Sequence, residues 1–215
     1  MESIEKSLKS EKQIALARLQ DLAMDSVLAI EKEVILHGGT AIWRCFGGKR
    51  FSFDLDLYAS DNQLKKLASN LTREFNKRGI TMDYPHSTER VISIHNPQAS
   101  VKLEILKKPA GKRSVQKEYV RADGTKMFIN TLSETDFIAE KIRAYKSRGY
   151  ARDLYDIYHL LSSYPKINKN TKRKLKTFLK SITLPKDEKQ LKELIYEGVA
   201  PTFDTIVNYI ENEIK

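Results

Sequence analysis

Two aspartates separated by one residue are the first candidates for chemistry in this sequence. Asp54 and Asp56 lie in the alternating stretch Phe51–Tyr58, which predicts a β-strand. Because side chains alternate faces along a strand, Phe53 and its apolar neighbours are expected in a core and the two aspartates on the opposite face. Two adjacent carboxylates repel each other, and a divalent metal relieves that repulsion by binding both. The pattern therefore favours a metal site over a strand whose aspartates are only solvated.

A glycine turn comes shortly before these acids. Gly38 and Gly39 follow an apolar strand expected at 34–36, and Thr40 opens a short helix expected to end at Phe46. The backbone amides of such a turn, together with a helix N-terminus, can hold phosphate groups. Thr40 offers its hydroxyl either to a phosphate or to the helix as an N-cap. An ordinary turn with a threonine cap is the alternative interpretation.

A third carboxylate is available at Glu104. The stretch 101–106 alternates, so its apolar residues share one strand face and Lys102 and Glu104 share the other. If this strand neighbours the one that carries Asp54, Glu104 would complete a three-carboxylate metal site. The alternative is a surface glutamate paired with a lysine.

These motifs resemble a known family. A strand, Gly-Gly-Thr, a helix and a strand with Asp-x-Asp are similar to the polymerase-β-type nucleotidyltransferase superfamily. More narrowly, Gly-Gly-Thr-Ala followed by Arg-Phe-Ser-x-Asp-x-Asp-Leu resembles the AbiEii/AbiGii-type nucleotidyltransferase toxins. A second signature of that family, a lysine and then Arg-Asp-x-x-Asp on helices, corresponds to Lys141 and residues 152–156. The resemblance spans roughly Val34 to Leu161, and about the last 50 residues match no motif.

The resemblance implies transfer of a nucleoside monophosphate from an NTP to an acceptor, with release of pyrophosphate. Asp54 and Asp56 would bind Mg²⁺, with Mn²⁺ as the alternative ion, and Glu104 would be the third ligand although it reaches farther than aspartate. The implied catalytic residues are Asp54, Asp56, Lys141, Asp153 and Asp156, and which of the last two acts is left open. The implied nucleotide-binding residues are Gly38, Gly39, Thr40, Arg50, Ser52, Lys141 and Arg148.

The charge of the chain suggests a polyanionic partner. The 38 Lys and Arg residues outnumber the 28 Asp and Glu residues, for a net charge of +10. The stretches Lys107–Arg121 and Lys166–Lys180 carry +5 and +7, and the rest of the chain sums to −2. Such clusters suit nucleic acid, although a solvated lysine-rich helix face is the alternative. The residues expected to bind RNA are Lys112, Arg113, Lys172, Arg173, Lys174 and Lys176.

The apolar pattern predicts an α+β fold, in which a nucleotidyltransferase-like mixed sheet with flanking helices precedes a C-terminal helical bundle. Helices are expected at 3–30, 40–46 and 61–77, strands at 34–36, 51–58, 80–83, 91–95, 101–106 and 127–129, and a basic loop at 107–117. From Ser133 onward four or five helices are expected, broken near Gly149 and three prolines. This organisation predicts an α/β catalytic domain at 1–131, a helical domain at 132–215 and an active cleft between them.

Other chemistries are excluded by composition. The single cysteine, Cys45, rules out an internal disulfide framework and a cysteine-based zinc cluster. No apolar run approaches the roughly 18 residues of a membrane span, so a cytoplasmic protein without a membrane partner is expected. We expect a magnesium-dependent nucleotidyltransferase that modifies RNA, with the 3′ end of tRNA as the acceptor that the family implies. A toxin–antitoxin or phage-defence pair with a cognate antitoxin is also implied.

Two alternatives remain open on the sequence. The first is nucleotidylation of a protein or a small molecule, which the two basic stretches disfavour because they exceed what one NTP needs. The second is a non-catalytic nucleic-acid-binding protein on the same scaffold. Clustered acids facing a polyanion have no use in such a binder, so the acids argue against it.

Overall fold

A computed structural model describes residues 3–83 and 91–215, and it divides the chain into two compact units. The first unit comprises the described residues of Met1–Cys45 and Phe51–Leu132. The second comprises Phe46–Arg50 and Ser133–Lys215. The short segment Phe46–Arg50 thus belongs with the later helices, although it lies inside the sequence of the first unit.

The first unit is built on one mixed sheet of seven strands in the order β3-β4-β5-β2-β1-β7-β6. The strands are β1 (Ile35–His37), β2 (Leu55–Ala59), β3 (Thr81–Asp83), β4 (Val91–His95), β5 (Ser100–Lys107), β6 (Ser114–Val120) and β7 (Lys126–Leu132). β2 runs parallel to β5 and antiparallel to β1, and β1 runs parallel to β7. The central strands therefore bring together segments that are far apart in the sequence.

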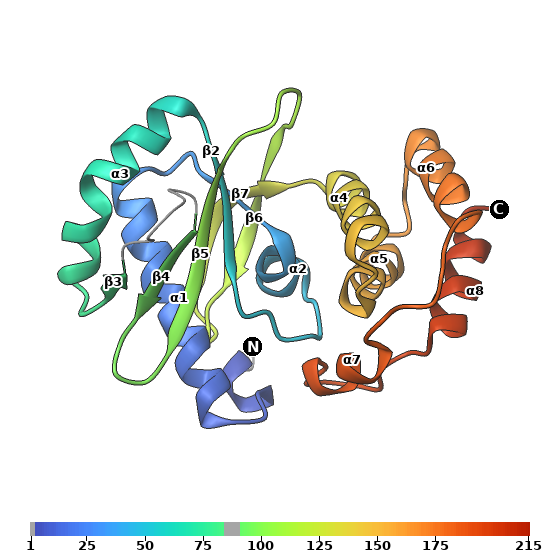
Figure 1. Cartoon of the computed structure of the whole chain (residues 1–215), viewed down its shortest axis with the longest axis horizontal. Helices are drawn as coiled ribbons and strands as arrows, with labels where there is room; N and C mark the ends of the chain where they lie inside the picture. Colours follow the sequence, from blue (N-terminus) through green and yellow to red (C-terminus); the bar gives the residue numbers. More distant parts are fainter. Residues whose placement is uncertain (1–2, 84–90) are drawn as a thin grey trace. The chain divides into compact units, whose positions relative to one another are not determined.

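Helices cover both faces of this sheet. Figure 1 shows α1 (Glu11–Ile30) and α3 (Asp61–Asn76) on one face and α2 (Gly38–Phe46) on the other. A short 3₁₀ turn, η1 (Ile4–Ser7), precedes α1, whose first turn is capped by Ser10. A capping box formed by Ser60 and Gln63 starts α3. The helix expected at 3–30 is thus interrupted before Glu11.

The strand expected at 51–58 begins only at Leu55, which changes the exposure of the residues before it. Leu55 and Leu57 are fully buried as expected, but Phe53 is 45% exposed, so its expected place in the core is wrong. Gln20 on α1 donates its side-chain amide to the carbonyls of Ser52 and Phe53. These carbonyls are therefore satisfied by a helix side chain instead of a neighbouring strand, and the alternation rule does not apply to them.

The basic loop expected at 107–117 is also only partly correct. β6 occupies its last residues and pairs antiparallel with β7 from Ser114↔Leu132 to Val120↔Lys126. β6 is an edge strand, and edge strands tolerate charged side chains that mask an apolar alternation in the sequence. Its partner lies across a hairpin, so the pairing could not be deduced from the basic stretch alone.

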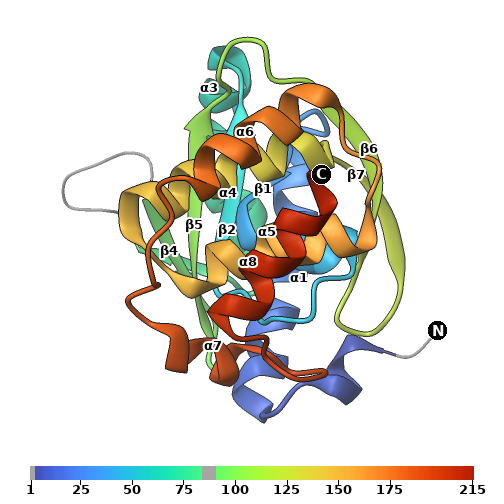
Figure 2. The same cartoon turned by 90° about the vertical axis from the view of Figure 1, so that its right-hand side faces the viewer.

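The second unit is helical, as predicted. Its helices are α4 (Glu134–Arg148), α5 (Ala151–Ser163), α6 (Lys169–Leu179), α7 (Glu188–Leu194) and α8 (Phe203–Glu213). Ser133 caps the start of α4, Gly149 caps its end after Arg148, and each later break contains one of the three prolines. Figure 2 shows these helices, with α5 contacting α4, α7 and α8. Among the described residues, no helix combines the length and apolarity needed to cross a membrane.

Candidate active site

The sheet places two of the predicted acids opposite each other. β2 and β5 are parallel neighbours, and their register pairs Asp56 with Glu104. Adjacent strands lie about 4.8 Å apart, so paired residues present their side chains on the same face. Both residues are half-buried, as is Asp54, which lies just before β2 begins. The condition set for Glu104, that its strand neighbours the one beside Asp54, is therefore met.

The glycine turn packs directly against Asp56. A Cβ atom at Gly38 would lie 2.0 Å from Asp56 Oδ2, and Gly38 has a φ of +72°, which favours glycine. His37, the residue before the turn, pairs with Asp56 across β1 and β2 and stacks on Tyr58 with ring centroids 3.6 Å apart. The absence of a side chain at Gly38 thus creates the space that the Asp56 carboxylate occupies.

Thr40 positions the other aspartate. Its side chain is fully buried, and its hydroxyl donates a hydrogen bond to the backbone carbonyl of Asp54. The one proton of this hydroxyl is thus given to the Asp54 carbonyl in this structure, and the expected contact with a phosphate stays a prediction. Helix α2 begins two residues earlier than expected, at Gly38, so Thr40 lies in its first turn. Ser52, expected to contact the nucleotide, is buried.

The donor chemistry at these strands suits a hard divalent cation. Carboxylate oxygens are the ligands that Mg²⁺ prefers, and the space left at Gly38 accommodates the Asp56 carboxylate beside Glu104. However, no group of three His, Cys, Asp or Glu side chains suited to a metal occurs among the residues that the structure describes. The three-carboxylate set expected from Asp54, Asp56 and Glu104 is therefore not assembled in this conformation.

The second unit holds the other signature in a buried ionic network. Asp156 accepts two hydrogen bonds of 2.6 Å from Arg50 and lies 2.7 Å from Lys141 Nζ. All three side chains are buried. Burial alone would raise the pKa of Asp156, but the charges and hydrogen bonds of Arg50 and Lys141 outweigh it, so the pKa lies below its ordinary value. Arg50, expected to contact the nucleotide, is instead committed to Asp156.

Asp153 extends the network to the end of α4. It is fully buried, accepts two hydrogen bonds of 2.7 Å from Arg148 and lies 3.4 Å from Lys141 Nζ. Lys141 therefore sits between two carboxylates, and its expected role of neutralising a phosphate is not supported by these contacts. Asp156 lies four residues after Arg152, a spacing that could indicate an ion pair within the helix. In the structure Asp156 pairs with Arg50 and Lys141.

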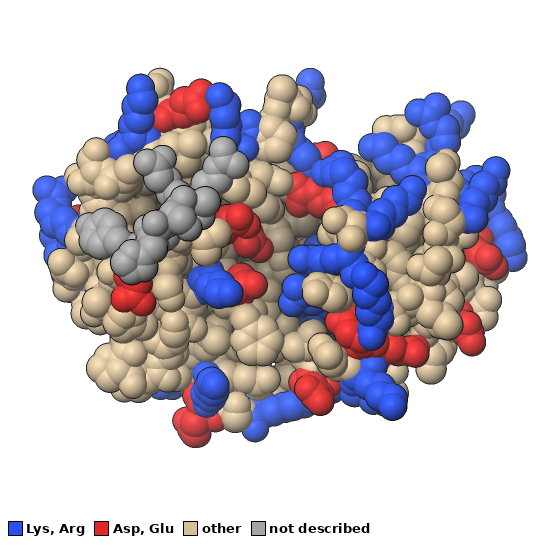
Figure 3. All heavy atoms as spheres, viewed as in Figure 1, with Lys and Arg blue, Asp and Glu red and all other residues tan. Residues whose placement is uncertain are grey.

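A cationic groove in the second unit is lined by some of the residues expected to bind RNA but not by others. It has a volume of about 340 Å³ and is lined by Ala139, Ile142, Arg143, Lys146, Arg173, Lys174 and Thr177. Arg173 and Lys174 of α6 are among the expected residues, whereas Arg143 and Lys146 of α4 were missed because they lie outside both basic stretches. Figure 3 shows Lys and Arg side chains gathered over α6. Lys172 and Lys176 do not line the groove.

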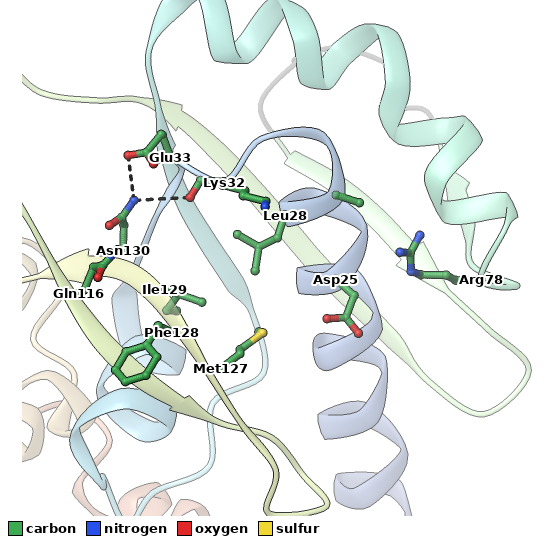
Figure 4. A pocket seen from close by; sticks show the side chains of 11 residues that line it. Asp25, Leu28, Lys32, Glu33, Arg78, Gln116, Met127, Phe128, Ile129 and Asn130 are labelled. Atoms are coloured by element: carbon green, nitrogen blue, oxygen red, sulfur yellow. Dashed lines mark hydrogen bonds between the residues drawn. The ribbon is translucent and has the colours of Figure 1, made fainter.

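The remaining two residues expected to bind RNA are in the first unit. Lys112 and Arg113 belong to the connection between β5 and β6, where Arg113 is exposed and Lys112 is half-buried. A different hollow of about 550 Å³, shown in Figure 4, is lined by parts of α1, β6 and β7, by the connection between α1 and β1, and by Arg78 just after α3. At its wall, Asn130 donates to Glu33 and to the Lys32 carbonyl. None of the expected site residues lines this hollow.

Comparisons with known proteins show a family match and two similar folds. The chain matches the family described as "Nucleotidyl transferase AbiEii toxin, Type IV TA system" over residues 21–206. The structure of JHP933 from Helicobacter pylori is similar, with a TM-score of 0.63 and 20% identity over 96% of this chain and 92% of that one.

A second structure from H. pylori, described as a candidate nucleotidyltransferase, has a TM-score of 0.57 and 17% identity over 96% of this chain and 94% of that one. These two likenesses concern the fold. No curated protein matches the chain. The family match spans most of the chain and includes both the Asp-x-Asp strand and the helical signature, and the protein therefore belongs to the AbiEii nucleotidyltransferase toxins of type IV toxin–antitoxin systems.

Proposed function

We propose that this nucleotidyltransferase moves a nucleoside monophosphate from an NTP to the 3′ end of an RNA, with tRNA as the favoured acceptor. The observation that carries the proposal is the pairing of Asp56 with Glu104 beside Gly38. We further propose that Asp54, Asp56 and Glu104 supply oxygen ligands to Mg²⁺, or to Mn²⁺ in its place. The enzyme would act in the cytoplasm, where a cognate antitoxin restrains it.

The proposed reaction is an in-line displacement at phosphorus. The oxygen of the acceptor hydroxyl forms a bond to the α-phosphorus of the NTP, and the bond from that phosphorus to the oxygen bridging to the β-phosphate breaks. Pyrophosphate leaves with this bridging oxygen, and the hydroxyl proton passes to a carboxylate or to water. A divalent cation, when bound, supplies charge neutralisation for the attacking and leaving oxygens.

The residues of the chain then have separable tasks. Asp54 and Asp56 would bind the metal, and the backbone of Gly38 and Gly39 would contact the triphosphate at the N-terminus of α2. Thr40 acts through Asp54, because it holds the carbonyl of that residue. These assignments use only groups of the first unit.

The buried network of the second unit is better suited to positioning than to direct contact. Lys141 already lies within 3.4 Å of Asp153 and 2.7 Å of Asp156, so its charge is balanced by two carboxylates. We propose that Asp153, Asp156 and Lys141 fix α4, α5 and Arg50 against one another. Loss of either aspartate would then reduce activity through the fold of this unit.

The groove between α4 and α6 supports an RNA acceptor. Four cations line it and no carboxylate does, which suits the closely spaced phosphates of a nucleic acid. The phosphates of one NTP do not require these four additional cations. A protein or small-molecule acceptor has no evident use for them either, so this observation favours RNA over both alternatives.

The transfer proposal can be tested with each of the four NTPs labelled at the α-phosphate. The protein is incubated with Mg²⁺ and total RNA, beside an Asp54→Ala variant and an Asp61→Ala control on the exposed start of α3. Label in RNA, lost only with Asp54→Ala, is expected and would identify the nucleotide. Label in protein or in a small molecule would contradict the RNA acceptor. No label, with RNA binding retained, would favour the non-catalytic alternative.

The groove has its own test with a matched pair of variants. Arg173→Gln with Lys174→Gln removes two cations that line the groove, and Lys172→Gln with Lys176→Gln removes two from the same helix that do not. We expect the first pair to weaken tRNA binding and to lower the salt slope by roughly 0.7–0.9 per lost phosphate contact. Equal effects of the two pairs would contradict a role for the groove.

A further inference from the structure

A second pocket lies beside Asp54 in the first unit. It has a volume of about 450 Å³, within the usual range for small-molecule sites. Three segments line it: the start of α1, the residues just before β2, and the β4–β5 hairpin. Figure 1 shows this hairpin alongside the start of α1, and contacts between α1 and β5 agree. Asp54 itself is part of the wall.

The pocket has an aromatic wall that is held in place. Phe53 is 45% exposed, and its ring lies edge-on to Phe51 at a centroid distance of 5.0 Å. Phe51 is fully buried, and the carbonyl of Phe53 accepts a hydrogen bond from Gln20. The ring of Phe53 is therefore fixed along one edge and open to solvent. An aromatic ring held in this way can stack a nucleobase.

The rest of the lining suits a nucleotide as well. Lys12 and Lys102 provide exposed cations, which attract a phosphate. Ser10, Gln13, Ser93 and Ser100 provide hydroxyl and amide groups that can hydrogen-bond to a base or a sugar. Asp54 is the one acid among the residues that line the pocket. The pocket thus combines a stacking surface, cations and polar groups next to a proposed metal ligand.

The order of the strands indicates which nucleotide the pocket would hold. β2 lies between β5 on one side and β1 on the other, so Asp54 separates the β4–β5 hairpin from the glycine turn that follows β1. In an in-line displacement, the attacking and leaving oxygens approach phosphorus from opposite sides. If the triphosphate lies at the glycine turn, the attacking hydroxyl must come from the side of the hairpin.

From this arrangement we propose that the pocket binds the terminal nucleotide of the acceptor RNA, with its base on Phe53 and its phosphate near Lys12 and Lys102. This inference rests on the proposed function, because it takes the glycine turn as the triphosphate site. It adds a specificity-determining residue, Phe53, that belongs to neither sequence signature. It also predicts that the enzyme prefers an unpaired 3′ end, because a paired base cannot stack on a side chain.

The test compares Phe53→Leu with Phe53→Tyr and with a control, Phe128→Leu. Leucine keeps an apolar side chain but removes the ring, tyrosine keeps the ring, and Phe128 is 71% exposed in the distant hollow of Figure 4. With labelled NTP and tRNA, we expect Phe53→Leu to raise the KM for tRNA roughly 5- to 150-fold. The KM for NTP should stay within about twofold, and the other two variants should behave as the unmodified enzyme.

A binding measurement separates this inference from the transfer reaction. Fluorescence anisotropy of a labelled single-stranded oligoribonucleotide with a free 3′ hydroxyl, without NTP or metal, should show weaker binding to Phe53→Leu alone. Lys12→Gln and Lys102→Gln should each lower the salt slope by roughly 0.7.

Three results for Phe53→Leu would overturn the inference. They are an unchanged KM for tRNA, unchanged oligonucleotide binding, and a KM raised for NTP alone. The last result would place the base of the NTP in the pocket. The proposed function fails in a different way, by absence of transfer with the unmodified enzyme. Circular dichroism of Phe53→Leu checks that the fold is retained.

Discussion

Gly38→Ala adds one methyl group that should both strain the backbone and displace the Asp56 carboxylate. A second glycine of the chain, Gly79, provides a control for the strain alone. At φ +72° any side chain is strained, at a cost of about 1–2 kcal/mol in the free energy of unfolding. The same methyl would lie 2.0 Å from Asp56 Oδ2, closer than any contact distance, so the Asp56 carboxylate must move. Gly79 has a similar φ of +67°, but a Cβ there would meet no atom within 4 Å. Gly79→Ala therefore carries the backbone strain without the displacement.

Both variants should lose similar stability, with a fall in Tm of roughly 2–8 °C in a chain of this size. Only Gly38→Ala should lose activity, because displacing a reacting group by about 1 Å can cost about 10²-fold in rate. The assay is transfer of labelled nucleotide at a temperature at which both variants are folded, beside thermal melting by circular dichroism. Equal activities for the two variants would refute the claim that the space at Gly38 positions a carboxylate required for transfer.

Four further predictions concern Thr40, Asp156 and Cys45. Thr40→Val leaves the Asp54 carbonyl without its donor, so thermal melts should show a loss of about 1–3 kcal/mol and transfer should slow, while Thr40→Ser should retain both. Asp156→Ala should cost about 3–5 kcal/mol, because it leaves the Arg50 and Lys141 charges buried with one carboxylate fewer. The pKa of Asp156 lies below its ordinary value of 3.8. Its ionised carboxylate therefore stabilises the fold fully above pH 3.8, and this contribution is lost as the pH falls further, through the pKa of the folded state. In thermal melts between pH 7 and 3, Asp156→Asn should lose less stability on acidification than the unmodified protein. Burial raises the pKa of Cys45 to about 12, so less of the thiol is ionised at pH 8, and a disulfide reagent should modify it more slowly in the native than in the unfolded protein.

The sheet and the helices were predictable where local patterns are strong. The alternation at Val91–His95 gave a strand with the observed bounds, and Ser133 and Gly149 marked the ends of α4 correctly. These features depend on neighbouring residues in the sequence. β6 was missed because an edge strand with charged side chains has little apolar alternation, and its stability comes from pairing with β7.

The candidate site was predictable as a set of residue types but not as a set of contacts. Alternation gave the strand faces of Asp-x-Asp and Glu104 but left open whether the two strands are neighbours, which the observed register shows. The partners of Arg50 and Thr40 were not predictable. Arg50 pairs with a carboxylate 106 positions later, and Thr40 bonds to a carbonyl 14 positions later. Polar residues in a signature can thus be committed to buried partners, which the sequence alone does not distinguish from contacts with substrate.

Phe53 illustrates the opposite error. Its place in an alternating stretch predicted burial, yet it lies outside the strand and exposes 45% of its surface beside Asp54. Its exposure follows from Gln20, a buried polar residue on α1 whose side-chain amide takes the place of a strand partner at this position. No spacing rule relates Gln20 to a segment more than 30 residues later.

A metal held by Asp54 and its neighbours is required for nucleotide transfer in the proposed reaction, and this requirement can be measured. Transfer of label from the preferred α-labelled NTP to tRNA is followed for the unmodified enzyme, Asp54→Asn and Asp61→Asn across a range of Mg²⁺ concentrations. We expect transfer to require Mg²⁺ and to fall about 10²–10³-fold or more with Asp54→Asn, while Asp61→Asn keeps full activity. A folded Asp54→Asn variant that transfers nucleotide at the unmodified rate would contradict a required role of Asp54 in metal binding.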